Sequence, residues 1–478
     1  MIYSNNNSRL KWWQLLSMTA VGLMLAISSP LAANPLPDQD DDEEEEEVTE
    51  EQVDEDDVNA RLYPVIEIDS DDDIDIPIPS IIKTEANHIT LNGADWSKVQ
   101  QAVAQTPLKS MAIVHIGDSH IQADIGTGVT RELLQYDLGN AGRGLISPLK
   151  MSGTNEPIDY IFSSSRSWVP AKLMSARWHQ TMGFTGASVK YTSKEGDITV
   201  GTSERDDYNP FSSVTLFHNG RMEVNQVTDE QGNNLHFRSL PSRDYTQIIL
   251  SKPETRVKIY FNCAGDLTLF GASLSGERPG IFYHAIGNNG ATYDTYNKIG
   301  TVGAGIAPLQ PELVIISLGC NEAFGHISAD AFYRSIDRLV NNIRYSNPSA
   351  QILLVTPMEC HKSVYTTVKK KVKVKRKGKK NRKATYTTKT VTSKQKSYGV
   401  NTAIKPLRDV ILKYGADKGI AVYDWWAVAG GEGASNRWID NGLYSKDRVH
   451  HTAKGYHLQG RLMYDALKEA IIIPVAKQ

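Results

Sequence analysis

The stretch "IVHIGDSHIQAD", residues 113–124, decides how the fold of the whole chain is understood. Its apolar run ends at Gly117, and Asp118, Ser119 and His120 follow directly. A short apolar run that ends in glycine is typical of a buried strand in a parallel sheet. Such sheets bind their ligands at the carboxyl ends of the strands, where these polar residues stand. The triplet therefore predicts either a serine nucleophile or one half of a metal site.

The C-terminal part of the chain alternates between expected strands and expected helices. Further buried strands are predicted at "ELVIISLG" (312–319), "QILLVTP" (351–357) and "IAVYDWW" (420–426). Helical spacing of apolar residues predicts helices at 124–139, 329–346, 401–419 and 452–471. This alternation predicts an α/β fold, with a parallel sheet that helices cover on both faces.

The overall composition is that of a globular protein. The chain has 478 residues, 40% of them hydrophobic, which is enough for a large core in roughly two or three domains. The net charge of −3 conceals an acidic block from Asp38 to Asp57 and a basic block from Lys369 to Lys383. Cys263, Cys320 and Cys360 are too few and too scattered for a disulfide framework or a zinc site, so we expect buried thiols and at most one disulfide.

The N-terminus has the pattern of an export signal. Arg9 and Lys11 precede the apolar run "LLSMTAVGLMLAI", and small residues allow cleavage after Ala33. This predicts a signal peptide at 1–33, with an uncleaved membrane anchor as the alternative because the cleavage pattern is imperfect. Residues 34–80 are strongly acidic and low in complexity, which predicts a disordered tether. We therefore expect an exported protein, attached to a membrane only if the signal stays uncleaved.

Two segments interrupt the alternation of strands and helices. Residues 151–280 contain alternating runs such as "SSVTLFHNG" and "RVKIYFN" with turns between them, which predicts an inserted β-rich domain. The α/β domain would then comprise 81–150 and 281–478. Within its second part, residues 363–396 carry two β-prone arms around "RKGKKN", so we expect either a basic ribbon or a solvated loop. Its charge could hold an anionic envelope polymer or a membrane surface, whereas nucleic acid is a poor partner for an exported protein.

A serine nucleophile needs a base within hydrogen-bond reach, and the segment "KDRVHHTAKGYHLQG", residues 446–460, offers one. Asp447 and His450 are three residues apart, so a single turn would place both side chains on one side. Asp447 could fix the tautomer of His450, which could take the proton from Ser119. His451 has the opposite side-chain direction, and we expect it to pack or cap locally.

Three further groups could stabilise negative charge on a substrate. The backbone N–H of Ser119 would stand at a helix start and point into the site. Gly290, in "AIGNNGATYDTY", is expected in a turn where bare backbone can approach a substrate. Asn321, in "ISLGCNEAFG", is expected just past a strand end, where its amide could donate to a developing negative charge. Each feature alone is common, but their order along the chain is far more specific.

That order resembles the four sequence blocks of the SGNH, or GDSL-like, hydrolases. The matching residues are Gly117-Asp118-Ser119, Gly290, Gly319-x-Asn321 and Asp447-x-x-His450. The resemblance covers about residues 110–150 and 280–470, and it implies a flavodoxin-like three-layer α/β/α sandwich. It also implies that Ser119 is the nucleophile, His450 the base and Asp447 its partner. The oxyanion hole would consist of Ser119, Gly290 and Asn321, without a metal or other cofactor.

A narrower resemblance, to the peptidoglycan O-acetylesterases of the bacterial envelope, follows from "GDSHIQAD" and the β-rich insertion. In that group the nucleophile is followed by His, and a carbohydrate-binding-like β-sandwich domain interrupts the hydrolase. The resemblance implies removal of acetyl from the 6-hydroxyl of N-acetylmuramic acid, in the periplasm or cell envelope. His120 would neighbour the nucleophile, and Cys320, which stands where Thr or Ala is frequent, would only pack.

Other functions stay open. The triplet also resembles the first block of the metallophosphoesterases, but the further ligand blocks of that family do not occur downstream. A non-catalytic wall-binding protein would use the β-rich domain to hold glycan. The same serine site could also act as an O-acetyltransferase, which passes the acyl group to a sugar alcohol, or as an acetyl esterase on another polysaccharide.

Overall fold

A computed structural model describes residues 77–203, 209–375 and 386–476. The predicted signal peptide at 1–33 and almost all of the predicted tether at 34–80 lie outside the described residues. None of the described helices has the length and apolar character that crossing a bilayer requires.

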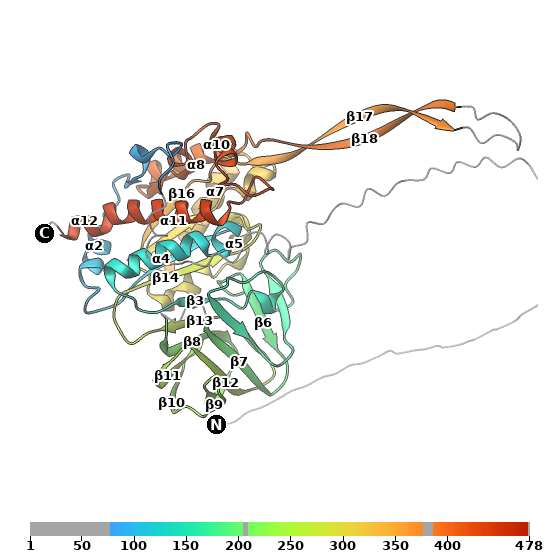
Figure 1. The fold of residues 1–478 in the computed structure, drawn as a ribbon. Helices are drawn as coiled ribbons and strands as arrows, with labels where there is room; N and C mark the ends of the chain where they lie inside the picture. Colours follow the sequence, from blue (N-terminus) through green and yellow to red (C-terminus); the bar gives the residue numbers. More distant parts are fainter. Residues whose placement is uncertain (1–76, 204–208, 376–385, 477–478) are drawn as a thin grey trace, which may run out of the picture. The chain divides into compact units, whose positions relative to one another are not determined.

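A mixed sheet forms the centre of the α/β part (Figure 1). Among the described residues its strands are β1 (Ile89–Thr90), β2 (Met111–Gly117), β14 (Ile281–Gly287), β15 (Leu313–Ser317), β16 (Gln351–Val355) and β19 (Ala421–Tyr423). They lie in the order β1-β19-β16-β15-β2-β14, and all neighbours pair in parallel except β1, which pairs antiparallel with β19. Numbered along the chain, the parallel strands follow the order 2-1-3-4-5, which is that of flavodoxin-like folds.

This strand order confirms the predicted flavodoxin-like fold, with two differences from the sequence-based expectation. The sheet is mixed rather than wholly parallel, because the two-residue β1 adds an antiparallel edge. Strand β14 was not among the predicted strands, although its sequence, "IFYHAIG", is the same kind of apolar run as that of β2, "MAIVHIG". Its polar residues Tyr283 and His284 are buried.

Helices cover both faces of the sheet, as the three-layer prediction requires. Because strand side chains alternate between faces, Val314 and Ile316 of β15 pack in one apolar cluster, whereas Leu313 and Ile315 pack in another. The first face carries α5 (Tyr293–Ile299), α6 (Val302–Ile306), α7 (Ala329–Ser346) and α8 (Ile404–Lys418). The second carries α2 (Ser97–Ala104), α4 (Ile125–Leu138), α9 (Trp425–Val428), α10 (Ala434–Asp440) and α11 (Ala453–Leu467). The helices predicted from apolar spacing correspond to α4, α7, α8 and α11.

Between α4 and β14 the described residues form two antiparallel sheets. One contains β3 (Gly144–Ile146), β5 (Val169–Lys172), β6 (Ala187–Tyr191), β8 (Phe211–Asn219), β10 (Phe237–Pro241), β11 (Tyr245–Glu254) and β13 (Leu267–Ser275). The other contains β4 (Tyr160–Ser163), β7 (Glu195–Thr202), β9 (Met222–Thr228) and β12 (Arg256–Cys263). Side chains of both sheets, such as Val214 and Ile259, bury themselves in one shared cluster. Since β3 pairs with β13, this β structure includes residues before the predicted boundary at 151.

The two arms of the predicted basic insertion pair with each other. Strands β17 (His361–Lys375) and β18 (Tyr386–Val400) form an antiparallel ribbon without a register shift. The remaining short elements are η2 (Thr84–Ala86), α3 (Ser119–Gln122), η3 (Lys150–Ser152), η4 (Ala307–Leu309), η5 (Asn321–Phe324), η6 (Lys468–Ile472) and α12 (Ile473–Ala476).

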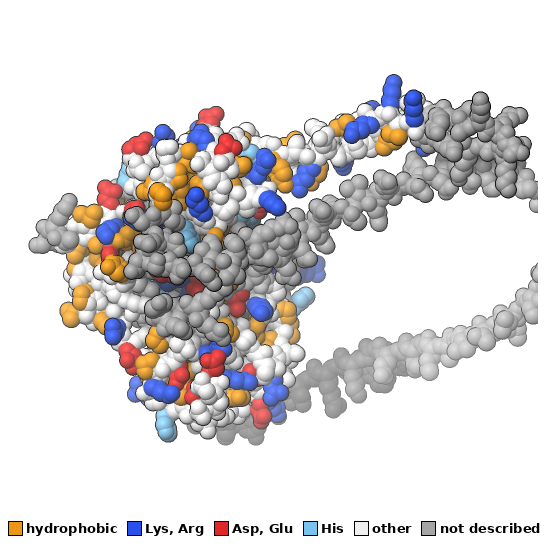
Figure 2. Space-filling view, viewed as in Figure 1, with side chains coloured by type: hydrophobic (Ala, Val, Ile, Leu, Met, Phe, Trp, Pro, Cys, Tyr) orange, Lys and Arg blue, Asp and Glu red, His pale blue; other side chains and the backbone are white. Residues whose placement is uncertain are grey.

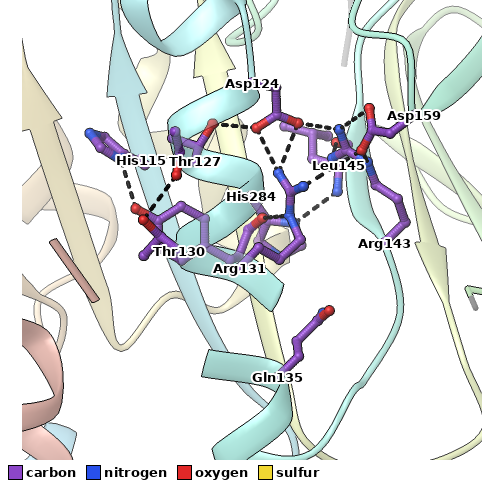
Figure 3. Close-up of polar contacts among 12 residues, drawn as sticks. His115, Asp124, Thr127, Thr130, Arg131, Gln135, Arg143, Leu145, Asp159 and His284 are labelled. Atoms are coloured by element: carbon purple, nitrogen blue, oxygen red, sulfur yellow. Dashed lines mark hydrogen bonds and ion pairs between the residues drawn. The ribbon is translucent and has the colours of Figure 1, made fainter. Parts of the chain in front are cut away.

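A buried ion-pair network joins α4 to the start of the β-rich region (Figure 3). Asp124 accepts hydrogen bonds from both Arg131 and Arg143, and Arg143 also pairs with Asp159, with Nε 2.8 Å from Oδ2. Arg131 Nε donates to the carbonyl oxygen of Tyr283 in β14 at 3.0 Å. Because buried charges must be paired, these contacts hold α4, β14 and the segment before β3 in one arrangement.

The carboxyl ends of β2 and β14 require glycine. Gly117 and Gly287 are register partners, and the backbone of α3 crosses directly over Gly287. A Cβ atom at position 287 would lie 1.9 Å from the backbone nitrogen of Gln122. Backbone atoms cannot move aside as a flexible side chain can, so this contact sets the height of α3 above the sheet.

We therefore expect Gly287→Ala to lower the free energy of unfolding by about 2–4 kcal/mol, through overpacking against backbone. The matched control is Gly128→Ala in α4, where a Cβ would meet only an Arg131 nitrogen at 4.0 Å. That variant should stay within about 1 kcal/mol of the parent chain. Chemical denaturation measures the stability of both variants. Equal denaturation midpoints would show that the backbone of α3 does not pack tightly against Gly287.

Candidate active site

Ser119 lies where the sequence predicts, at the first residue of α3, immediately after β2. Asp118 caps this short helix, because its Oδ1 accepts a hydrogen bond from the backbone N–H of His120 at 3.0 Å. Gly117 makes the sharp transition possible, since a Cβ there would lie 2.2 Å from Cγ1 of Ile121. Strand β15 is the other neighbour of β2, so Ser119 stands at the point where the strand order reverses.

The structure brings Ser119, His450 and Asp447 together. Ser119 Oγ lies 2.8 Å from His450 Nε2, and His450 Nδ1 lies 2.6 Å from Asp447 Oδ2. The other carboxylate oxygen of Asp447 accepts hydrogen bonds from the Ser445 hydroxyl at 2.7 Å and the Val449 N–H at 2.9 Å. Since every oxygen of Asp447 has a donor, the carboxylate holds one orientation towards the imidazole.

The charges around the imidazole favour its protonated form. Burial lowers the pKa of His450, but the hydrogen bond and charge of Asp447 and the charge of Asp118 outweigh it, so the pKa lies above its ordinary value. Burial raises the pKa of Asp447, but the hydrogen bond and charge of His450 bring that pKa well below its ordinary value. Burial raises the pKa of Asp118 to about 6 against the opposing hydrogen bond from His120.

Gly290 and Asn321 lie beside the same strand ends. Gly290 has a φ of +75°, and a Cβ there would meet nothing closer than Met174 Cε at 3.5 Å. Asn321 Nδ2 donates to the carbonyl oxygen of Ala291 at 3.0 Å and to Asp118 Oδ2 at 3.2 Å. These bonds join the loop of Gly290 to the loop of Ser119. Both amide hydrogens of Asn321 therefore have acceptors already, which the sequence does not reveal.

Sequence reasoning missed Gln122, which connects the loops around the site. Its buried side chain accepts a hydrogen bond from the Asn289 N–H at 2.6 Å, and its Nε2 donates to Asn155 Oδ1 at 2.7 Å. Asn289 Nδ2 donates to the same Asn155 oxygen at 2.6 Å. The only sequence signal was position, since Gln122 lies three residues after Ser119 at the end of the same turn.

His120 and His451 line the interior side of the site. His120 Nδ1 lies 3.1 Å from the Tyr456 hydroxyl, and its ring centroid is 5.2 Å from those of His450 and His451. His451 packs among aromatic rings as predicted, but neither of its ring nitrogens has a hydrogen-bond partner within the described residues. A cavity of about 70 Å³ adjoins His120, His451 and Cys320, and it is large enough for several water molecules.

All three cysteines lie within the described residues, and the structure also bears on the alternative of a metal site. Cys320 and Cys360 are buried, unpaired thiols, as expected, and Cys263 is unpaired and half-buried. No group of three or more His, Cys, Asp or Glu side chains is arranged for a metal ion in the part of the chain that the structure describes.

We predict that Asp118→Asn lowers the pKa of His450, because it removes a negative charge that stabilises the imidazolium. The pKa is measured from the pH dependence of the His450 ring signals in NMR spectra. Asp330→Asn, at the exposed start of α7, removes the same charge elsewhere and should leave the titration unchanged. An unaltered titration in Asp118→Asn would mean that Asp118 does not act on His450 electrostatically.

Comparison with known proteins gives a family match and a shared fold. Residues 264–458 match the model of the GDSL-like lipase/acylhydrolase family. This range contains Gly290, Asn321, Asp447 and His450, while Ser119 lies upstream, beyond most of the β-rich region. No match was found among curated protein sequences.

Solved structures extend the likeness to most of the chain. A structure described as a peptidoglycan O-acetylesterase in action has a TM-score of 0.60 and 22% sequence identity, covering 80% of this chain and 99% of its own. A lipase/acylhydrolase from Enterococcus faecalis has a TM-score of 0.26 and 18% identity, covering 40% of this chain and 78% of its own. The first of these shows a shared fold.

Proposed function

We propose that this chain is an ester hydrolase of the SGNH, GDSL-like type, and that it removes O-acetyl groups from a cell-envelope glycan with Ser119, His450 and Asp447 as its catalytic triad. The observation that carries the proposal is the 2.8 Å contact between Ser119 Oγ and His450 Nε2. It is the distance at which an imidazole can take a proton from a hydroxyl.

The reaction then has two halves. Ser119 Oγ attacks the ester carbonyl carbon while His450 Nε2 takes the hydroxyl proton, and Asp447 stabilises the imidazolium. The imidazolium returns the proton to the leaving sugar oxygen, which leaves Ser119 acetylated. Water, deprotonated by His450, then attacks the acetyl carbon, the bond from that carbon to Ser119 Oγ breaks, acetate leaves, and the imidazolium returns the proton to Ser119 Oγ.

The negative charge of each tetrahedral intermediate would be stabilised by the N–H groups of Ser119 and Gly290 and by the Asn321 amide. The Gly290 N–H makes no hydrogen bond within the described residues, so it can donate to an oxyanion. Asn321 would exchange its longer bond, 3.2 Å to Asp118, for the oxyanion. Asp118 would thus hold the amide in place until charge develops.

The β-rich region borders the candidate site. Asn155 of that region bonds to Gln122 and Asn289, and Met174 lies near Gly290. We propose that residues 151–280 form an inserted carbohydrate-binding-like domain that presents the polymer to Ser119. The similarity to the structure of a peptidoglycan O-acetylesterase makes O-acetylated N-acetylmuramic acid the preferred candidate. Such a substrate would place the protein in the periplasm or cell envelope.

The deciding experiment measures acetate release from O-acetylated peptidoglycan, acetylated xylan and a small acetyl ester. Wild type should act on all three, with the highest kcat/KM on peptidoglycan. Ser119→Ala should lower each rate by about three to six orders of magnitude, since the acyl-enzyme cannot form. Matching thermal unfolding curves for the two proteins serve as the folding control.

Three outcomes would contradict the proposal. Full activity in Ser119→Ala would remove the nucleophile from the mechanism. Activity that a chelator abolishes and a divalent ion restores would favour the metal site. Transfer of acetyl to a glycan hydroxyl, without release of acetate, would indicate an acetyltransferase.

A further inference from the structure

We propose that the β17–β18 ribbon is a docking arm that binds a linear polyanion, a polymer with regularly repeated carboxylate or phosphate groups. Binding needs no ester hydrolysis, so it goes beyond the proposed function. If the polymer is also the acetylated substrate, the arm would supply it to the candidate site.

The ribbon carries many positively charged side chains and no negatively charged ones. The two strands, residues 361–375 and 386–400, contain nine Lys residues and no Asp or Glu. Figure 2 shows lysine side chains along the paired strands. Alternate lysines along a strand are about 7 Å apart, which is less than the Debye length of about 8 Å at physiological ionic strength, so their charges repel one another in water. A bound anionic chain would relieve that repulsion and release counterions.

The pairing register places five of the ribbon's lysines on one face. Lys369, Lys371 and Lys373 of β17 stand opposite threonines of β18, while Lys394 and Lys396 stand opposite Thr367 and Tyr365. Directly opposed residues share a face, so these five lysines point to the same side. All five are exposed.

The spacing on this lysine face suits a polymer with regular charges. Alternate residues of a strand lie about 7 Å apart on one face, so Lys369, Lys371 and Lys373 follow one another along β17 at that spacing. Threonine hydroxyls from β18 lie beside them and add hydrogen-bond donors. An ammonium group acts as a point charge, so such a row recognises repeated charge rather than one shaped ligand.

The end of the ribbon at His361 lies against the loop that carries His450, the candidate general base. The His361 N–H donates to the carbonyl oxygen of Arg448 at 3.0 Å, and the Arg448 guanidinium lies 4.9 Å from the Tyr398 ring centroid. Arg448 stands between Asp447 and His450 in the sequence. A polymer held on the ribbon would therefore be concentrated near Ser119, as expected for linked binding sites.

The opposite face favours a polymer over a membrane surface. It carries Val364, Val368, Val372 and Val391, together with Lys362, Lys370 and Lys389. Residues 361–400 contain no Trp, Phe, Leu, Ile or Met, the large side chains that anchor amphipathic segments in lipid. Valine is the ordinary choice for a strand, so this face needs no bilayer to explain it.

The test uses the full chain carrying Ser119→Ala, so that hydrolysis cannot alter the ligand. Binding of polyglutamate and of polyphosphate is measured against salt concentration, and the two polymers distinguish carboxylate from phosphate. We expect both Kd values to rise at least about tenfold in Lys369→Gln/Lys371→Gln/Lys373→Gln, with a weaker dependence on salt. The matched control, Lys83→Gln/Lys98→Gln/Lys109→Gln, changes three exposed lysines outside the ribbon and should bind within about twofold of the parent.

Equal losses in both triple variants, or no binding of either polymer, would overturn the proposal. Binding of phosphatidylglycerol vesicles without binding of either polymer would identify a membrane surface and also overturn it. Small-ester hydrolysis, measured in chains that keep Ser119, should be unchanged by the ribbon substitutions. An inactive parent chain that still binds polyanion would contradict the esterase proposal and leave the docking arm standing.

Discussion

The hydrogen bond between Ser119 and His450 is the contact on which the rest of the account depends. It joins residues 331 positions apart, so it exists only if the strand order places the ends of β2 and the loop before α11 together. The reversal of strand order beside β2 opens the space for it. Gly287 then sets the height of α3, because the α3 backbone lies directly on it. The position of Ser119 above the sheet thus depends on how closely the backbone packs at Gly287.

Much of this arrangement could be predicted from local patterns. Continuous apolar runs identify β2, β15, β16 and β19, because strands buried on both faces have no polar alternation. The spacing of Asp447 and His450 predicted a pair within one turn, and the structure has it. Such features depend on neighbours in the sequence, so the sequence alone reveals them.

The rest depends on contacts between distant segments. The Gln122 side chain accepts a hydrogen bond from the Asn289 N–H. The Asn321 amide donates to Ala291 and Asp118. No local pattern predicts either, since each follows from three loops meeting at one sheet edge. The partner of the buried His284 in β14 likewise follows only from the folded chain, where the Leu145 N–H donates to His284 Nδ1.

The central claim is that Ser119 is acylated with the help of His450. The most direct measurement stops the reaction with a small acetyl ester within its first turnover and maps the modified peptide by mass spectrometry. We expect one acetyl group on Ser119, and none when His450 is replaced by alanine. Turnover at the full rate with no acetyl on Ser119, or with the label on another residue, would contradict it.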